Sequence, residues 1–150
     1  MTPSFQIAID CRSPQLLVQF WSKALGYVAE SPPTPHEGWN SFWRSLGVPD
    51  HELNEQSDQG DSIIDPEGNG PRIWFQIVPE TKTIKNRWHV DIRASGSRDL
   101  PLETRRARVR AAADQLTRAG ATFIRSLEEE GIDHFAVAMA DPEGNEFDIN

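Results

Sequence analysis

Asp65-Pro66-Glu67-Gly68-Asn69 occurs a second time, letter for letter, as Asp141-Pro142-Glu143-Gly144-Asn145. The two copies begin about half a chain length apart. Proline early and glycine late are typical of a tight turn that contains one left-handed residue. Apolar segments with extended character flank each copy, which predicts two β-hairpins. These segments are residues 62–64 and 73–78 in the first half, and 135–140 and 147–149 in the second half.

The elements upstream of each hairpin also repeat. An alternating strand precedes a helix with one apolar face, and a glycine and a further short strand follow the helix. We therefore predict an α+β fold of two βαβββ modules, about 1–80 and about 86–150, in a single domain that covers residues 1–150. The predicted strand, helix and strand are residues 5–11, 14–25 and 27–30 in the first module, and 87–94, 102–119 and 121–127 in the second.

The first module carries a long additional segment, residues 32–60, which is rich in proline, glycine and polar residues. We expect one short helix in it, near residues 40–46. Loops of this length without regular structure are uncommon and are often functional. We therefore expect either a lid or a decorated sheet edge.

The composition excludes several classes of protein. The chain of 150 residues has a formal net charge of −8 and a sequence pI of about 4.9, which disfavours binding to nucleic-acid phosphates. The sequence contains neither a membrane-length apolar run nor a basic and apolar leader. Cys11 is the only cysteine, which excludes an internal disulfide and a thiolate metal cluster. We expect a cytoplasmic protein without nucleic-acid or membrane partners.

Four of the predicted strands have one uniformly apolar face, which the helices would cover. The opposite faces mix aromatic, imidazole, amide and carboxylate groups. This mixture suits a small-molecule pocket better than bare solvent, although a plain solvent-facing sheet is the alternative. We predict ligand contacts for four residues on these faces: Trp74, Gln76, Asp91 and Glu146.

Three stretches, residues 10–27, 71–91 and 140–148, resemble the glyoxalase-like proteins of the vicinal oxygen chelate superfamily. The first runs from Asp10-Cys11-Arg12-Ser13-Pro14 into Phe20-Trp21-Ser22-Lys23-Ala24-Leu25-Gly26-Tyr27. The last contains the second copy of the repeat followed by Glu146-Phe147-Asp148. This resemblance to the glyoxalase, bleomycin resistance and dioxygenase group implies that the two modules form an open, barrel-like cup. It also implies a homodimer.

The resemblance further implies a site for one divalent metal ion. The ligand positions of the superfamily fall on Gln6, His89 and Asp148, and the same comparison makes His89 and Asp148 the catalytic residues. Imidazole and carboxylate ligands suit Fe, Mn, Ni or Zn. Glutamine is a weak ligand, so a metal-free cup in which His89 only donates or accepts hydrogen bonds is the alternative.

Two functions follow from these alternatives. The first is an enzyme, a lyase, isomerase or oxygenase that acts on a small oxygen-rich molecule with the help of the metal. The second is a metal-free protein that binds a small molecule or sequesters an antibiotic. In the second case Trp74, Trp88 or the segment around Trp39 and Trp43 would stack on the ligand.

Overall fold

The computed structural model describes residues 3–150 and contains two compact units, one that ends at Glu80 and one that begins at Thr81. Each unit is described by itself. Within residues 3–150 we find no helix with the length and apolar character that crossing a bilayer requires. The prediction that both units belong to a single domain stays a prediction.

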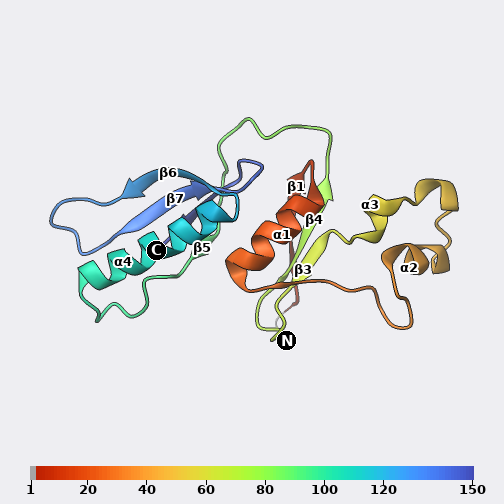
Figure 1. The fold of residues 1–150 in the computed structure, drawn as a ribbon, viewed down its shortest axis with the longest axis horizontal. Coiled ribbons are helices and arrows are strands. Elements are labelled where there is room, and N and C mark those ends of the chain that lie inside the picture. Colours follow the sequence, from red (N-terminus) through yellow and green to blue (C-terminus); the bar gives the residue numbers. More distant parts are fainter. Residues whose placement is uncertain (1–2) are drawn as a thin grey trace. The chain divides into compact units, whose positions relative to one another are not determined.

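The first unit contains a four-stranded sheet in the order β1-β4-β3-β2 (Figure 1). Strands β1 and β4 are parallel, and the other neighbours are antiparallel. The additional segment between β2 and β3 holds three short helices, and the predicted helix near residues 40–46 is confirmed as α2. The elements are β1 (Gln6–Cys11), α1 (Pro14–Leu25), β2 (Val28–Ala29), α2 (Trp39–Ser45), the 3-10 helix η1 (Asp50–Glu52), α3 (Glu55–Asp58), β3 (Ser62–Ile64) and β4 (Arg72–Ile77).

The second unit repeats this topology, with a four-stranded sheet in the order β5-β8-β7-β6. Its first and last strands are again parallel neighbours. The βαβββ order is therefore confirmed in both halves, and each sheet is open, with two free edges, rather than closed into a barrel. The elements are β5 (Asp91–Ile92), α4 (Leu102–Arg118), β6 (Thr122–Leu127), β7 (Ala136–Ala140) and β8 (Glu146–Ile149).

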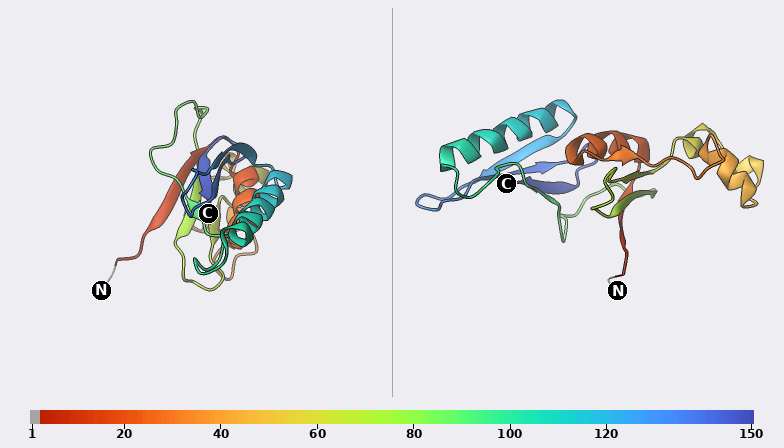
Figure 2. Two further views of the ribbon diagram at one scale, coloured as in Figure 1. Left: turned by 90° about the vertical axis from the view of Figure 1, so that its left-hand side faces the viewer. Right: turned by 90° about the horizontal axis from the view of Figure 1, so that it is seen from below.

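Helix α1 in the first unit and helix α4 in the second each cover the apolar face of the sheet in their own unit. Figure 2 shows how α4 lies along its sheet. Val109 and Leu116 of α4 are buried, as are Phe147 and Ile149 of β8. The same alternation holds in β4, where Ile73 and Phe75 are buried. The predicted burial of the apolar face is wrong for one residue at the end of each of two strands. Phe5 directly precedes β1 and is 72% exposed, and Ile77 is the last residue of β4 and is 59% exposed.

The predicted strand over residues 87–94 is much shorter in the structure, because only Asp91 and Ile92 complete the ladder with β8. The flanking residues are still extended beside β8. The Asp148 N–H donates to the Val90 carbonyl at 3.0 Å, and the Ala94 N–H donates to the Asn150 carbonyl at 2.6 Å. The segment therefore keeps its place at the sheet edge although its regular pairing is brief.

In both repeated turns the aspartate carboxylate accepts hydrogen bonds from the backbone N–H groups of the third and the fifth residue. The Asp65 carboxylate accepts hydrogen bonds from the backbone N–H groups of Glu67, Asn69 and Gly70, at 2.8–3.0 Å. These bonds, that from Glu67 first among them, hold the pKa of Asp65 below its usual range. In the second copy, Asp141 Oδ1 accepts from the N–H groups of Glu143 and Asn145, both at 2.9 Å.

Glycine is required at the fourth position of both turns. Gly68 and Gly144 have φ angles of 73° and 89°, in the left-handed region that other residues avoid. The repeated pentapeptide is thus a structural element that closes a hairpin, and its aspartate acts by satisfying backbone donors.

We expect Asp141→Ala to destabilise the protein by about 1–3 kcal/mol, because two partly buried backbone N–H groups lose their acceptor. Asp141 is only 2% exposed, whereas its counterpart Asp65 is half-buried. Asp65→Ala serves as the matched variant and should cost less, since water can reach the freed donors of the first turn. Urea denaturation of the two variants measures this difference, and equal losses would contradict the assignment.

Candidate functional site

Three predicted site residues of the second unit, His89, Asp91 and Asp148, meet on the sheet face that points away from α4. Asp91 and Asp148 are register partners in the parallel β5–β8 ladder, so their side chains share a face. His89 precedes β5, two residues before Asp91. Its Nδ1 lies 2.8 Å from Asp91 Oδ1 and 3.8 Å from Asp148 Oδ2. The imidazole thus contacts both carboxylates.

Two carboxylates side by side on neighbouring strands repel each other unless a cation lies between them. Asp91 and Asp148 form such a pair, and both are partly exposed, with side-chain exposures of 51% and 25%. The compensating charge can be a protonated His89 or a bound metal ion. The arrangement is therefore suited to binding a cation.

The donor atoms of the three residues fit a single divalent ion. One ligand atom from each lies within 4.8 Å of the others. Donors on one ion at bond lengths of about 2.0–2.2 Å lie at most about 4.4 Å apart, so only small side-chain rotations are needed. One imidazole and two carboxylates suit Mn, Fe or Zn. Asp91, predicted as a ligand contact, is thus also a potential metal donor, which its spacing of two residues from His89 on an extended segment could have indicated.

Glu146 holds the segment before β5, and its predicted contact with a ligand stays a prediction. Its Oε2 accepts from the Asn86 N–H at 3.0 Å and lies 3.4 Å from Lys85 Nζ. Burial alone would raise the pKa of Glu146, but the hydrogen bonds from Asn86 and Lys85 lower it. The carboxylate therefore stays ionised and anchors this segment to β8.

In the first unit, Gln6 belongs to a network centred on Arg72. The amide Oε1 of Gln6 accepts from Arg72 Nη1 at 2.7 Å. The same guanidinium contacts Glu30 Oε2 at 2.6 Å and donates to Ser62 Oγ at 2.9 Å. Ser62 Oγ in turn donates to Glu30 at 2.7 Å. The only oxygen with which Gln6 could bind a metal is thus engaged by a cationic group.

Burial alone would raise the pKa of Glu30, but hydrogen bonds from Arg72 and Ser62 and the positive charge of Arg72 outweigh burial and lower it. Glu30 is therefore ionised at neutral pH and balances the arginine on this face of the sheet.

Two predicted ligand contacts of the first unit, Trp74 and Gln76, are half-buried on the same face of β4 as Arg72. The indole Nε1 of Trp74 donates to Asp61 Oδ2 at 2.7 Å. Gln76 lies beside Asp10 in the β1–β4 register. Ligand contact by these two residues stays a prediction, and Asp61 is a partner that strand alternation did not reveal.

The predicted site residues are thus divided between the units. Gln6, Trp74 and Gln76 lie in the first, whereas His89, Asp91, Glu146 and Asp148 lie in the second. The structure brings His89, Asp91 and Asp148 together within their own unit. Participation of Gln6 in the same site stays a prediction.

Residues 6–150 match the model of a glyoxalase-like domain family. Among curated protein sequences, none is significantly similar to this chain. Solved structures share the fold at low identity. A glyoxalase/bleomycin resistance protein/dioxygenase family enzyme from Burkholderia phytofirmans is 18% identical, with a TM-score of 0.56 and coverage of 97% of this chain and 94% of that one.

Two further structures have TM-scores of 0.58. The hypothetical protein SA1046 from S. aureus is 12% identical, with coverage of 99% of this chain and 93% of that one. The fosfomycin resistance protein FosX from Listeria monocytogenes is 9% identical, with coverage of 100% and 90%. That FosX structure is a complex with Mn(II) and 1S,2S-dihydroxypropylphosphonic acid. These likenesses extend over nearly the whole of each chain.

We expect Glu30→Gln to lower the melting temperature at neutral pH and to matter progressively less in acid. The lowered pKa of Glu30 means that its ionised form stabilises the fold fully above the unfolded pKa of about 4.3, and that this contribution is lost as the pH falls through the folded pKa. Thermal melting of the unaltered protein and of Glu30→Gln, from neutral pH into acid, measures how the difference in melting temperature depends on pH. Glu37→Gln, at an exposed position, is the control, and a difference for Glu30→Gln that does not vary with pH would contradict the argument.

Proposed function

Because the chain belongs to the glyoxalase-like domain family, we propose that it is a metal-assisted enzyme that acts on a small oxygen-rich molecule. His89, Asp91 and Asp148 hold the divalent ion. The observation that carries this proposal is the convergence of their donor atoms within 4.8 Å on one face of the second sheet. The Mn(II) complex of FosX, a protein of the same fold, supports it.

The protein residues of this site bind and orient the metal. A bound ion would polarise a substrate oxygen and so stabilise negative charge that develops on it. His89, Asp91 and Asp148 supply three ligands, which leaves coordination positions for water and substrate. The backbone of His89 and Asp91 is held against the inner strand β8, because the Asp148 N–H donates to the Val90 carbonyl at 3.0 Å.

A substrate bound to the metal would lie over the strands that neighbour β8 on the same sheet face. Asp148 is the register partner of Ala138, and Ala138 is the partner of Arg125 on β6. Strands are spaced by about 4.8 Å, so Arg125 lies roughly 10 Å from Asp148 with only a methyl side chain between them. A guanidinium at that position suits a negatively charged group of the substrate. We therefore favour a small acid that also offers oxygen atoms to the metal.

Gln6 has a different role in this proposal. Since its amide oxygen accepts from Arg72, Gln6 orients the guanidinium and does not bind the ion. Trp74 and Gln76 then belong to the ligand-contacting surface of the first unit, and the homodimer is an expectation that this function shares with the family.

A metal-free binding protein, including one that sequesters an antibiotic, is the second candidate. One observation favours it. The 2.8 Å separation between His89 Nδ1 and Asp91 Oδ1 is already that of a good hydrogen bond. The imidazole then contacts the two carboxylates without an ion between them.

We expect His89→Ala to abolish binding of Mn²⁺ and Zn²⁺, because imidazole is the strongest ligand of the three for these ions. Asp91→Asn and Asp148→Asn should each weaken the affinity by more than the roughly 10–100-fold that loss of an outer-shell partner costs, because each removes a charged ligand, and Gln6→Ala should leave the affinity nearly unchanged. Calorimetric titration of purified protein with each ion measures the affinities, with circular dichroism as the check of folding. Once a substrate is known, His89→Ala should reduce turnover most, Asp91→Asn and Asp148→Asn less, and Gln6→Ala least.

The matched control is Asp114→Asn, which removes one exposed carboxylate from α4 of the same unit and should not change the affinity. Negligible heats for the unaltered protein at millimolar metal would end the metal-enzyme proposal in favour of the binding protein. Equal affinities of unaltered protein and His89→Ala would place any bound ion elsewhere.

A further inference from the structure

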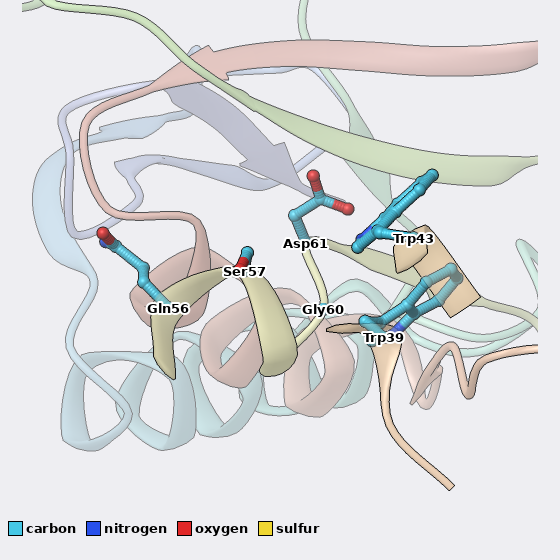
Figure 3. A pocket seen from close by; sticks show the side chains of 6 residues that line it. All are labelled: Trp39, Trp43, Gln56, Ser57, Gly60 and Asp61. Carbon is cyan, nitrogen blue, oxygen red and sulfur yellow. The ribbon is translucent and has the colours of Figure 1, made fainter. Parts of the chain in front are cut away.

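A pocket of about 110 Å³ lies in the additional segment of the first unit, between α2, α3 and the residues that lead into β3 (Figure 3). None of the residues discussed for the metal site takes part in it. Two indoles, two uncharged polar side chains, one glycine and one carboxylate line it: Trp39, Trp43, Gln56, Ser57, Gly60 and Asp61.

The two indoles form a continuous aromatic wall. Trp39 and Trp43 lie one helical turn apart on α2, and their rings stack with centroids 5.6 Å apart and an interplanar angle of 24°. The backbone of Gly60 packs directly against the Trp39 ring. Its φ is +72°, and a Cβ there would lie 2.7 Å from the Trp39 Nε1. The close approach of the backbone to Trp39 is thus available only to glycine.

The helices that form the pocket are tied together by hydrogen bonds. Ser57 Oγ of α3 donates to Asn40 Oδ1 of α2 at 2.6 Å, and Asn40 Nδ2 donates to the Asn54 carbonyl at 2.8 Å. The N-terminus of α3 also has a complete capping box between Asn54 and Ser57. The walls are therefore pre-organised, which lowers the entropy lost when a ligand binds.

The carboxylate of Asp61 is fixed at the same pocket. Its Oδ2 accepts from the Trp74 Nε1 at 2.7 Å, which anchors the side chain between the sheet and the indoles of α2. In Figure 3 the Asp61 carboxylate lies on the side of the pocket occupied by Trp43. An aspartate next to stacked indoles combines a negative charge with electron-rich ring faces.

The surrounding charge has the same sign. Residues 32–61 contain six acidic side chains and one basic side chain, Arg44, so this fifth of the chain carries −5 of the net charge of −8. Arg44 is itself paired, since its Nε lies 2.6 Å from Asp50 Oδ1. A cation approaching this segment is therefore attracted before it reaches the pocket.

We infer that this pocket binds the head group of an organic cation, an alkylated ammonium that packs on the indoles and pairs with Asp61. Tryptophan is the best aromatic partner for such a cation, and alkylated ammonium groups are recognised in this way elsewhere. The pocket of about 110 Å³ is smaller than the cavity of about 150 Å³ that holds a benzene molecule, so it can take the head group only, and the rest of the cation would lie outside it. The inference is independent of the metal proposal, since every lining residue lies in the other unit.

The experiment uses choline as the probe and the five indole N–H signals of the protein as the readout. We titrate choline chloride against matched sodium chloride and follow the signals by two-dimensional NMR, with Trp43 assigned from Trp43→Leu. Saturable shifts of the Trp39 and Trp43 signals are expected. The uncharged analogue, with a tert-butyl group in place of trimethylammonium, should bind about tenfold more weakly or not at all.

Two variants separate the contribution of the Asp61 charge to choline binding from that of the Trp43 ring. Asp61→Asn removes the charge but keeps an oxygen that can accept from Trp74, so the fold should persist while choline affinity falls about tenfold. Trp43→Leu should reduce it similarly. Phe5→Leu, which alters an exposed aromatic residue of the same unit outside the pocket, is the control and should leave choline binding unchanged. Equal binding of choline and its uncharged analogue, no effect of Asp61→Asn, or no saturable shift would each overturn the inference.

Discussion

The side chain of Asp141 determines where the proposed metal ligands point. It accepts hydrogen bonds from the N–H groups of Glu143 and Asn145, and so sets the length and register of the β7–β8 hairpin. Because strand side chains alternate with a period of two, a slip of one residue would turn Asp148 toward α4 and Phe147 toward the polar face. The convergence of Asp148 with Asp91 thus depends on a turn that contributes no atom to the site.

The two units share the βαβββ topology, but the charged residues on the polar faces of their sheets differ. In the first unit a single arginine, Arg72, meets Glu30, Ser62 and Gln6, and the face is electrostatically balanced within the unit. In the second unit Asp91 and Asp148 are neighbours and only His89 lies between them. An unbalanced pair of carboxylates is the stronger indication of a cation site, which is why the proposed metal belongs to the second half of the repeat.

The segment between β2 and β3 adds chemistry that the repeat itself does not contain. It carries most of the net negative charge and both indoles of α2. Asp61 joins it to β4 twice, since its carboxylate accepts from Trp74 and its carbonyl accepts from the Phe75 N–H. An organic cation in this pocket and an anionic substrate beside Arg125 would bind to different units through opposite charges. The two proposals therefore stand or fall separately.

The sequence by itself determined the repeated order of strand, helix and three strands, but not η1 and α3 in the additional segment. The repeated pentapeptide predicted both hairpins, and the alternation of apolar residues predicted which side of β4 and β8 is buried, because both signals are local and arise within a few residues. It also placed His89 and Asp148 on one face. Only the tertiary structure showed that β5 is two residues long and that Asp91 is a third donor in the His89 and Asp148 group.

The sequence also did not predict the hydrogen-bond partners of the polar side chains. Gln6 and Arg72 are 66 residues apart, and Trp74 meets Asp61 from an adjacent strand segment. Such contacts depend on strand register and on side-chain torsions, which a local period does not specify. The same holds for the indole pocket, where Trp39 and Trp43 are recognisable as one helix face but the approach of Gly60 and Asp61 is a consequence of folding alone.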